Sequence, residues 1–148
     1  ANKVETAEAE KLADETLAVM NHAGFAAVFA PGSRAEIALV ADLPEIGDVA
    51  RLNGRIDRLA ITPDEILVVD FKTNRPPPSE VDGVSTLYIA QMALYRAALS
   101  KVFPGRRIAC ALVWTEGPRL MPIPEDRLEA ELGRIRTRLD SPAANTRY

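Results

Sequence analysis

Residues 54–73 read GRIDRLAITPDEILVVDFKT, and this stretch predicts two strands joined by a tight turn. With a two-residue loop at Pro63 and Asp64, the register counted outward from the turn places Asp57 opposite Asp70. Directly opposed residues in an antiparallel ladder have Cβ atoms about 4.5 to 5.5 Å apart. If the turn closes a hairpin, both carboxylates therefore point at one spot.

The same hairpin predicts a mixed-charge face. Side chains alternate along a strand, so Asp70 and Lys72 share one face while Val69 and Phe71 take the other. Two like charges about 5 Å apart repel by roughly 3 kcal/mol at an effective dielectric near 20. A divalent cation removes this repulsion, and hard oxygen ligands suit Mg²⁺ or Mn²⁺. The pattern indicates metal-assisted hydrolysis of a phosphodiester, with Lys72 orienting a water or holding a phosphate oxygen. The alternative is a surface hairpin with solvated acids whose charge the lysine offsets.

A second pair of polar residues, Gln91 and Tyr95, lies in a strongly helical stretch downstream. Their i, i+4 spacing places both side chains on the same helix face. One interpretation is that they support a functional site. The other is that an amide and a phenol are satisfied in the seam between a helix and a sheet.

Taken in order, Gly-x-x-Asp at 54–57, Asp-x-Lys at 70–72 and Gln-x-x-x-Tyr at 91–95 resemble the RecB-like branch of the PD-(D/E)XK nucleases. The resemblance runs from about residue 25 to about residue 125. More narrowly, the chain looks like the C-terminal nuclease domain of AddA-type helicase-nucleases in the segments 33–36, 54–59, 69–75, 91–96 and 112–115.

The resemblance implies a role for each matching residue. Asp57 and Asp70 would bind the metal, with the backbone carbonyl of Phe71 as a further ligand. Lys72 would be the catalytic lysine, and Gln91 would also belong to the catalytic set.

The same resemblance implies outer roles for two further residues, Tyr95 and Glu36, and two arginines are candidates for phosphate contacts. Tyr95 would support the site near the DNA path. Arg58 and Arg75 are available for phosphates, although they could equally be solvated surface arginines. Glu36 falls where the family also has a glutamate on the first strand. It would be an outer metal ligand, or simply an acid that closes a strand edge.

One departure from the family concerns a histidine that usually completes the metal shell from a helix before the first strand. The only histidine, His22, stands in Met20-Asn21-His22-Ala23-Gly24, where it is expected to end a helix. The chain opens with Ala1-Asn2-Lys3, which fits a piece of a longer polypeptide. The family's histidine is then expected upstream, and this piece could bind metal weakly and cut poorly.

The expected elements are helices at about 3–22, 85–103 and 125–139, strands at about 35–41, 51–61, 65–72 and 108–115, and an edge strand at 120–123. A loop with three prolines is expected at 73–83. A buried stripe on the second helix would hold Tyr88, Met92, Tyr95, Leu99 and Val102. The resulting αβββαβ order is that of an α/β, restriction-endonuclease-like core, with a central mixed sheet flanked by helices.

Length and composition fit one such domain, with 148 residues of which 47% are hydrophobic. The expected divisions are an N-terminal helix at 1–24, the nuclease domain at 25–140 and a flexible tail at 141–148. The net charge of −3 would be odd for a stand-alone DNA-binding protein, which normally presents a basic face. DNA binding that rests mainly on a motor elsewhere would explain it.

A single cysteine, Cys110, is expected to be buried and inert. It excludes the iron-sulfur cluster of some relatives, which requires four thiolates. No apolar run reaches the roughly 18 residues of a membrane span, and no signal peptide pattern opens the chain. We expect a bacterial cytoplasmic location and no contact with a membrane.

The function that follows is a Mg²⁺-dependent DNA exonuclease domain, with Mn²⁺ as a substitute. No phosphate-binding Gly-x-x-x-x-Gly-Lys motif is present, so ATP enters only through an upstream motor in the implied full-length protein. That motor would feed single strands to the domain during end resection for double-strand break repair, in complex with an AddB-type subunit. The alternative is a weak or inactive nuclease-fold module that binds DNA or a partner. A metal-dependent phosphatase ranks below both, since no covalent aspartyl motif is present.

Overall fold

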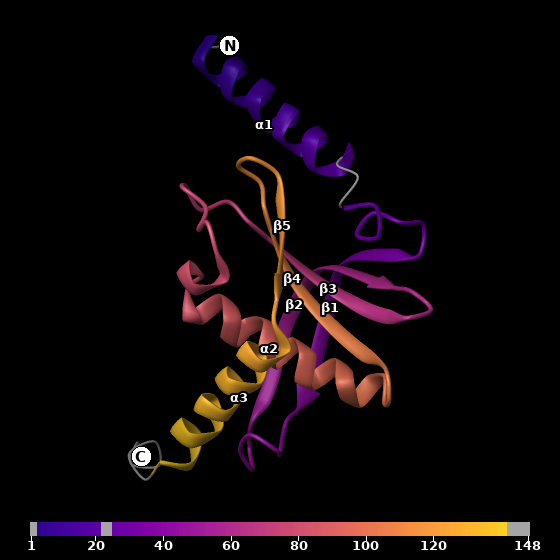
Figure 1. Cartoon of the computed structure of the whole chain (residues 1–148), viewed down its shortest axis with the longest axis vertical. Coiled ribbons are helices and arrows are strands. Elements are labelled where there is room, and N and C mark those ends of the chain that lie inside the picture. The colour runs from indigo at the N-terminus through magenta and orange to yellow at the C-terminus, as the bar shows by residue number, and fades with distance from the viewer. Residues whose placement is uncertain (1–2, 22–24, 142–148) are drawn as a thin grey trace.

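A five-stranded mixed sheet forms the centre of the computed structural model, which describes residues 3–21 and 25–141 (Figure 1). The strands follow one another across the sheet in chain order: β1 (Ser33–Asp42), β2 (Arg51–Ile61), β3 (Glu65–Lys72), β4 (Arg107–Trp114) and β5 (Arg119–Ile123). Only β3 and β4 run parallel, and the helix α2 (Thr86–Val102) lies in the crossover that a parallel pair requires. The predicted α/β class, with a mixed sheet flanked by helices, is confirmed.

The hairpin of β2 and β3 has the predicted register. Its turn is closed by the Thr62 amide, which donates to the Glu65 carbonyl at 3.0 Å. The ladder then runs from the Ile61–Ile66 pair to the Arg58–Val69 pair. It ends there, one pair short of Asp57 and Asp70, so the two strands part where the carboxylates begin.

The helices α2 and α3 (Glu125–Asp140) cover one face of the sheet. At the start of α2, the Ser85 hydroxyl accepts a hydrogen bond from the Leu87 amide at 3.3 Å and caps the first turn. The predicted stripe is confirmed at Met92, Tyr95 and Leu99, which are buried. It is wrong at Val102, which is 59% exposed because α2 ends there.

The opposite face is covered by a turn-rich segment rather than by a helix. Phe25 and Val28 are buried against the outward side chains of β3 and β4, and the Phe29 ring stacks on Phe71 with centroids 6.3 Å apart. Helix α1 (Lys3–Asn21) lies at one end of the molecule, beyond this segment (Figure 1). The structure describes α1 as far as Asn21, and His22, where the sequence predicts the helix to end, lies outside the described residues.

The remaining expectations differ little from the structure. Strands β2 and β3 have the predicted bounds, and the other elements shift by one or two residues at their ends. The predicted loop at 73–83 contains one short 3-10 turn, Val81–Gly83. The expected tail after Pro142 lies outside the described residues.

Cys110 is buried as predicted, with its Sγ 3.7 Å from the Met92 carbonyl oxygen, and burial raises the pKa of the thiol to about 12. A thiol with so high a pKa is a poor nucleophile at neutral pH. Across residues 3–21 and 25–141, the structure contains no helix with the length and apolar character needed to span a bilayer.

Candidate active site

A polar cluster lies on the α2 side of the sheet, at the carboxyl end of β3. Ile66 and Val68 enter the core from this face, and the alternation of the strand places Asp70 and Lys72 next along it. The Asp70 residue is only 4% exposed, and its Oδ2 is 2.5 Å from the Lys72 Nζ. The strand therefore passes directly from apolar core to a buried ion pair.

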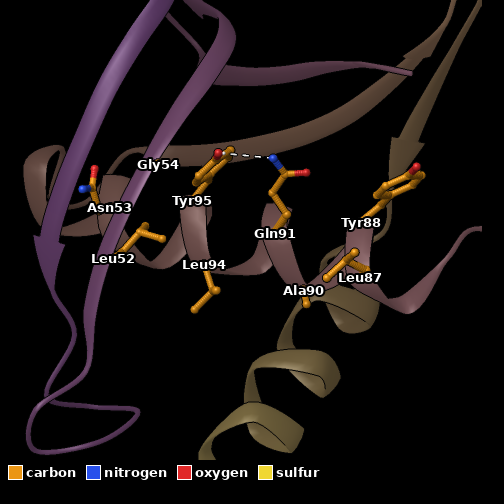
Figure 2. Close-up of a pocket in the computed structure, with 9 residues that line it drawn as sticks. All are labelled: Leu52, Asn53, Gly54, Leu87, Tyr88, Ala90, Gln91, Leu94 and Tyr95. Atoms are coloured by element: carbon orange, nitrogen blue, oxygen red, sulfur yellow. Dashed lines mark hydrogen bonds between the residues drawn. The ribbon is translucent and has the colours of Figure 1, made fainter. Parts of the chain in front are cut away.

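Helix α2 supplies the other half of the cluster. The Gln91 side-chain amide donates to Asp70 Oδ1 at 3.2 Å, and its carbonyl oxygen accepts from Lys72 Nζ at 3.1 Å. Its amide nitrogen also contacts the Tyr95 hydroxyl at 3.2 Å, one helical turn away (Figure 2). That hydroxyl donates to the Arg55 carbonyl at 2.8 Å, which links the helix to β2. The structure thus brings together four of the predicted site residues.

The glycine of the Gly-x-x-Asp motif makes this link possible. A Cβ added at Gly54 would stand 2.7 Å from Tyr95 Cε1, far inside van der Waals contact. The motif alone gave no reason for a glycine at this position. The reason is the close approach of the tyrosine ring to the β2 backbone.

Asp57 enters the site from β2, where the ladder has ended. Its Oδ2 accepts a hydrogen bond from the Phe71 amide at 2.8 Å. In an extended strand the N–H and C=O of one residue point to the same side, so the Phe71 carbonyl is directed toward β2 and Asp57. The next carbonyl, that of Lys72, points the other way and accepts from the Thr115 amide at 3.1 Å.

The electrostatics of the cluster centre on Asp70. Burial raises the pKa of this carboxyl, and the nearby charge of Asp57 raises it further. The hydrogen bond and charge of Lys72 and the hydrogen bond from Gln91 lower the pKa without cancelling the effect of burial. A carboxyl with a raised pKa beside a second carboxyl gains most from a cation that shares the two negative charges.

Tyr88 and Asn74 contact the cluster but were not predicted from the sequence as functional. The Lys72 Nζ lies 3.8 Å from the centroid of the Tyr88 ring, a distance typical of a cation–π contact. The Tyr88 hydroxyl donates to Asn74 Oδ1 at 2.8 Å. Tyr88 was interpreted as core only, although its position three residues before Gln91 places it on the same side of α2.

The structure places the remaining predicted residues away from this cluster. Glu36 has a positive φ of 54° and forms an exposed ion pair with Arg55 at 3.0 Å. Arg75 pairs with Glu15 of α1 at 2.9 Å. These two ion pairs engage Glu36 and Arg75 without joining either residue to Asp70.

Arg58 lies on the opposite face of the sheet from α2. Its Nε donates to the Val28 carbonyl at 3.0 Å, and its guanidinium lies 5.1 Å from the centroid of the Phe29 ring. This arginine is engaged inside the protein.

Among residues 3–21 and 25–141, no three His, Cys, Asp or Glu side chains are grouped to hold a metal ion. A cation at this site would therefore depend on Asp57, Asp70 and the Phe71 carbonyl. These are hard oxygen donors of the kind Mg²⁺ binds, usually together with water or substrate phosphates. The donor set fits such an ion.

Comparison with known proteins identifies one family and several similar structures. The sequence model of the PD-(D/E)XK nuclease superfamily matches residues 3–142. No curated protein sequence matches the chain. A solved structure from Eubacterium rectale, described as a "putative exonuclease", aligns with a TM-score of 0.60 and 15% identity over 86% of this chain and 50% of its own.

A second solved structure, that of SSO0001, aligns with a TM-score of 0.41 and 15% identity over 93% of this chain and 61% of its own. A score this low carries no argument. The chain spans only about half to three fifths of the length of these two proteins.

Proposed function

Because this chain belongs to the PD-(D/E)XK nuclease superfamily, we propose that it is a Mg²⁺-dependent DNA nuclease domain that hydrolyses phosphodiester bonds as an exonuclease. One observation carries the proposal. The ion pair of Asp70 and Lys72 is buried, bonded to Gln91 from the facing helix and within electrostatic reach of Asp57. A buried, hydrogen-bonded set of opposite charges beside a raised carboxyl pKa is typical of an active site.

The metal would be held by Asp57, Asp70 and the Phe71 carbonyl, with Mn²⁺ able to replace Mg²⁺. When bound, such an ion polarises the phosphate and lowers the pKa of an attacking water. Glu36 would act only through the outer shell of this site, since its carboxylate pairs with Arg55.

The protein's own contribution is to hold positive charge where negative charge develops. The Lys72 ammonium is fixed by Asp70, by Gln91 and by the face of the Tyr88 ring, so little of its freedom remains to be lost when a phosphate arrives. Gln91 is itself held by Tyr95. Gln91 and Tyr95 therefore position the lysine, while Lys72 contacts the reacting phosphate.

The finer assignment is an AddA-type helicase-nuclease that acts in double-strand break repair. Its support is the sequence resemblance around the three motifs. In that assignment an upstream ATP-driven motor delivers single strands, an AddB-type subunit is the partner, and Arg75 helps to guide the DNA. The protein would then work in the bacterial cytoplasm, and the nuclease domain would occupy residues 25–140.

A second candidate is a module with this fold that binds DNA or a partner but does not cut. Its support is that both oxygens of Asp70 already have protein partners, Lys72 and Gln91. A cation that binds Asp70 must share these oxygens with Lys72 and Gln91 or displace them. If this exchange is too costly, the site stays a rigid structural ion pair.

Calorimetry with Mn²⁺ and Mg²⁺, run beside cleavage of single-stranded DNA, separates the two candidates. The informative variant is Asp70→Asn, and Asp64→Asn in the exposed turn of the same hairpin is the matched control. The nuclease predicts that Asp70→Asn removes metal binding and lowers cleavage by at least about 100-fold, with Asp64→Asn unchanged. Metal-independent DNA binding with no cleavage in any of the three proteins would favour the module.

A further inference from the structure

A cavity of about 420 Å³ opens between α2 and the first half of β2 (Figure 2). Its walls are the helix face that carries Leu87, Ala90 and Leu94, and the strand segment 52–54. Figure 2 shows Leu87 and Tyr88 at one end of the lining residues, and Leu52 and Asn53, on the strand, at the other. The cavity is thus a groove along α2 that no described side chain fills.

The groove is continuous with the candidate active site. Two of its lining residues, Tyr88 and Gln91, contact the catalytic lysine: Lys72 Nζ lies 3.8 Å from the Tyr88 ring centroid and 3.1 Å from Gln91 Oε1. An occupant of the groove would therefore lie one side chain away from Lys72.

The chemistry of the groove differs from that of the site beside it. None of its lining residues carries a charge. Leucines and the Tyr88 ring provide apolar surface, while Asn53 and Gln91 supply amide groups that both donate and accept hydrogen bonds. Phosphates have no cationic partner in the groove, but they do at Lys72. An uncharged group with apolar faces and polar edges matches the lining.

We propose that this groove holds an unpaired nucleobase, that of the nucleotide adjoining the phosphate at Asp70 and Lys72. The inference rests on the proposed function, which brings that phosphate to Lys72. Stacking on aromatic side chains is the common way in which proteins bind bases without reading their sequence. A base inside a duplex is paired and stacked on both sides, so a duplex must first pay to unpair and unstack it, whereas a single strand can place one in the groove without that cost. The groove therefore makes the site selective for single strands.

Fluorescence anisotropy in EDTA, which stops cleavage, tests this directly on the 148-residue chain. The probes are a labelled single-stranded oligonucleotide, the same strand with abasic residues in its middle, and the matching duplex. Because base stacking is worth about 1 to 3 kcal/mol, the intact strand should bind at least about fivefold more tightly than the abasic strand. The duplex should bind no better than the abasic strand.

A pair of leucine and valine variants on α2 sharpens the test. Leu87 and Val102 are 71% and 59% exposed, so neither replacement by alanine should disturb the core, but only Leu87 lines the groove. Leu87→Ala should cut the preference for the intact strand by about fourfold, the effect of losing one buried methylene contact or slightly more. Val102→Ala should leave it unchanged.

The outcomes distinguish this inference from the proposed function. If the chain cuts DNA but binds intact and abasic strands equally, the groove does not hold a base and only the nuclease stands. If it prefers intact strands in a Leu87-dependent way but never cuts, the base site stands and the nuclease fails. Equal losses in Leu87→Ala and Val102→Ala would also overturn the base site.

Discussion

The two faces of strand β3 accommodate charged side chains in different ways. On the α2 face, Asp70 and Lys72 are buried together, bonded to each other and to Gln91. On the other face, the neighbouring Val69 and Phe71 are apolar, and Arg58 is satisfied there by a backbone carbonyl and an aromatic ring. Opposite charges meet on one face, and a single charge is capped on the other.

The difference teaches which of the two faces can do chemistry. A charge capped by Val28 and Phe29 only closes the segment 25–32 over the sheet. A pair of opposite charges held by a third polar side chain can exchange partners with an incoming phosphate or cation. Replacing residues on the Arg58 face should therefore change stability, and replacing residues on the α2 face should change activity.

The largest expected effect comes from Lys72→Met, which keeps the length of the side chain and removes its charge. Cleavage should fall by about 100-fold or more, because the positive charge opposite the phosphate is gone. Metal binding should become tighter, since the Asp70 carboxylate loses the ammonium now 2.5 Å away. Calorimetry and single-turnover cleavage measure the two effects.

The matched control is Lys101→Met at the end of α2, where the lysine pairs with Glu45 on the surface at 2.8 Å. It should change neither quantity. Weaker metal binding in Lys72→Met would mean that the lysine supports the metal site instead of competing for it.

A pH profile gives the next largest effect. Burial raises the pKa of Asp70, and a cation binds only its ionised form, so metal affinity should fall with decreasing pH at a higher pH than an ordinary aspartate would produce. The corresponding stability contribution is present below the ordinary pKa and is lost as pH rises through the raised pKa.

Asp70→Asn, neutral at every pH, should remove that loss, so the variant gains stability relative to the wild type as pH rises. Urea unfolding between about pH 4 and 8 measures it. If Asp70→Asn instead lost stability relative to the wild type as pH rises, the sign would be contradicted.

Two glycine-to-alanine changes should have smaller effects on the free energy of unfolding, one destabilising and the other stabilising. Gly54→Ala forces the Tyr95 ring away from β2 and should cost about 1 to 3 kcal/mol of the free energy of unfolding. Because Tyr95 positions Gln91, cleavage should fall as well. Gly133→Ala, on an exposed helix face with nothing within 4 Å of the new Cβ, should stabilise by about 0.5 to 1 kcal/mol and leave cleavage unchanged.

On the opposite face of the sheet, an effect on stability alone is expected. Arg58→Gln should lower the free energy of unfolding by about 1 to 2 kcal/mol through the lost Val28 and Phe29 contacts. Its cleavage activity should be unchanged. Arg55→Gln, at an exposed ion pair, should change stability by about 0.5 kcal/mol or less. Weaker DNA binding by Arg58→Gln at unchanged stability would restore the phosphate-contact role that the sequence suggested.

The sequence by itself determined the order of the elements and the register of the hairpin. Apolar alternation and the Pro63-Asp64 turn fixed the pairing of Ile61 with Ile66, because a one-residue slip would turn every side chain to the wrong face. The same alternation places Asp70 and Lys72 on one face. These are local properties, readable from spacing.

Only the tertiary structure decided what those side chains meet. The end of the ladder before Asp57, the bond from Gln91 to Lys72 and the stacking of Tyr88 on that lysine depend on how α2 crosses the sheet. The same packing turned Arg58 toward Val28 and left Val102 in solvent. Contacts between elements distant in sequence are set by packing of the whole core, which spacing along the chain does not encode.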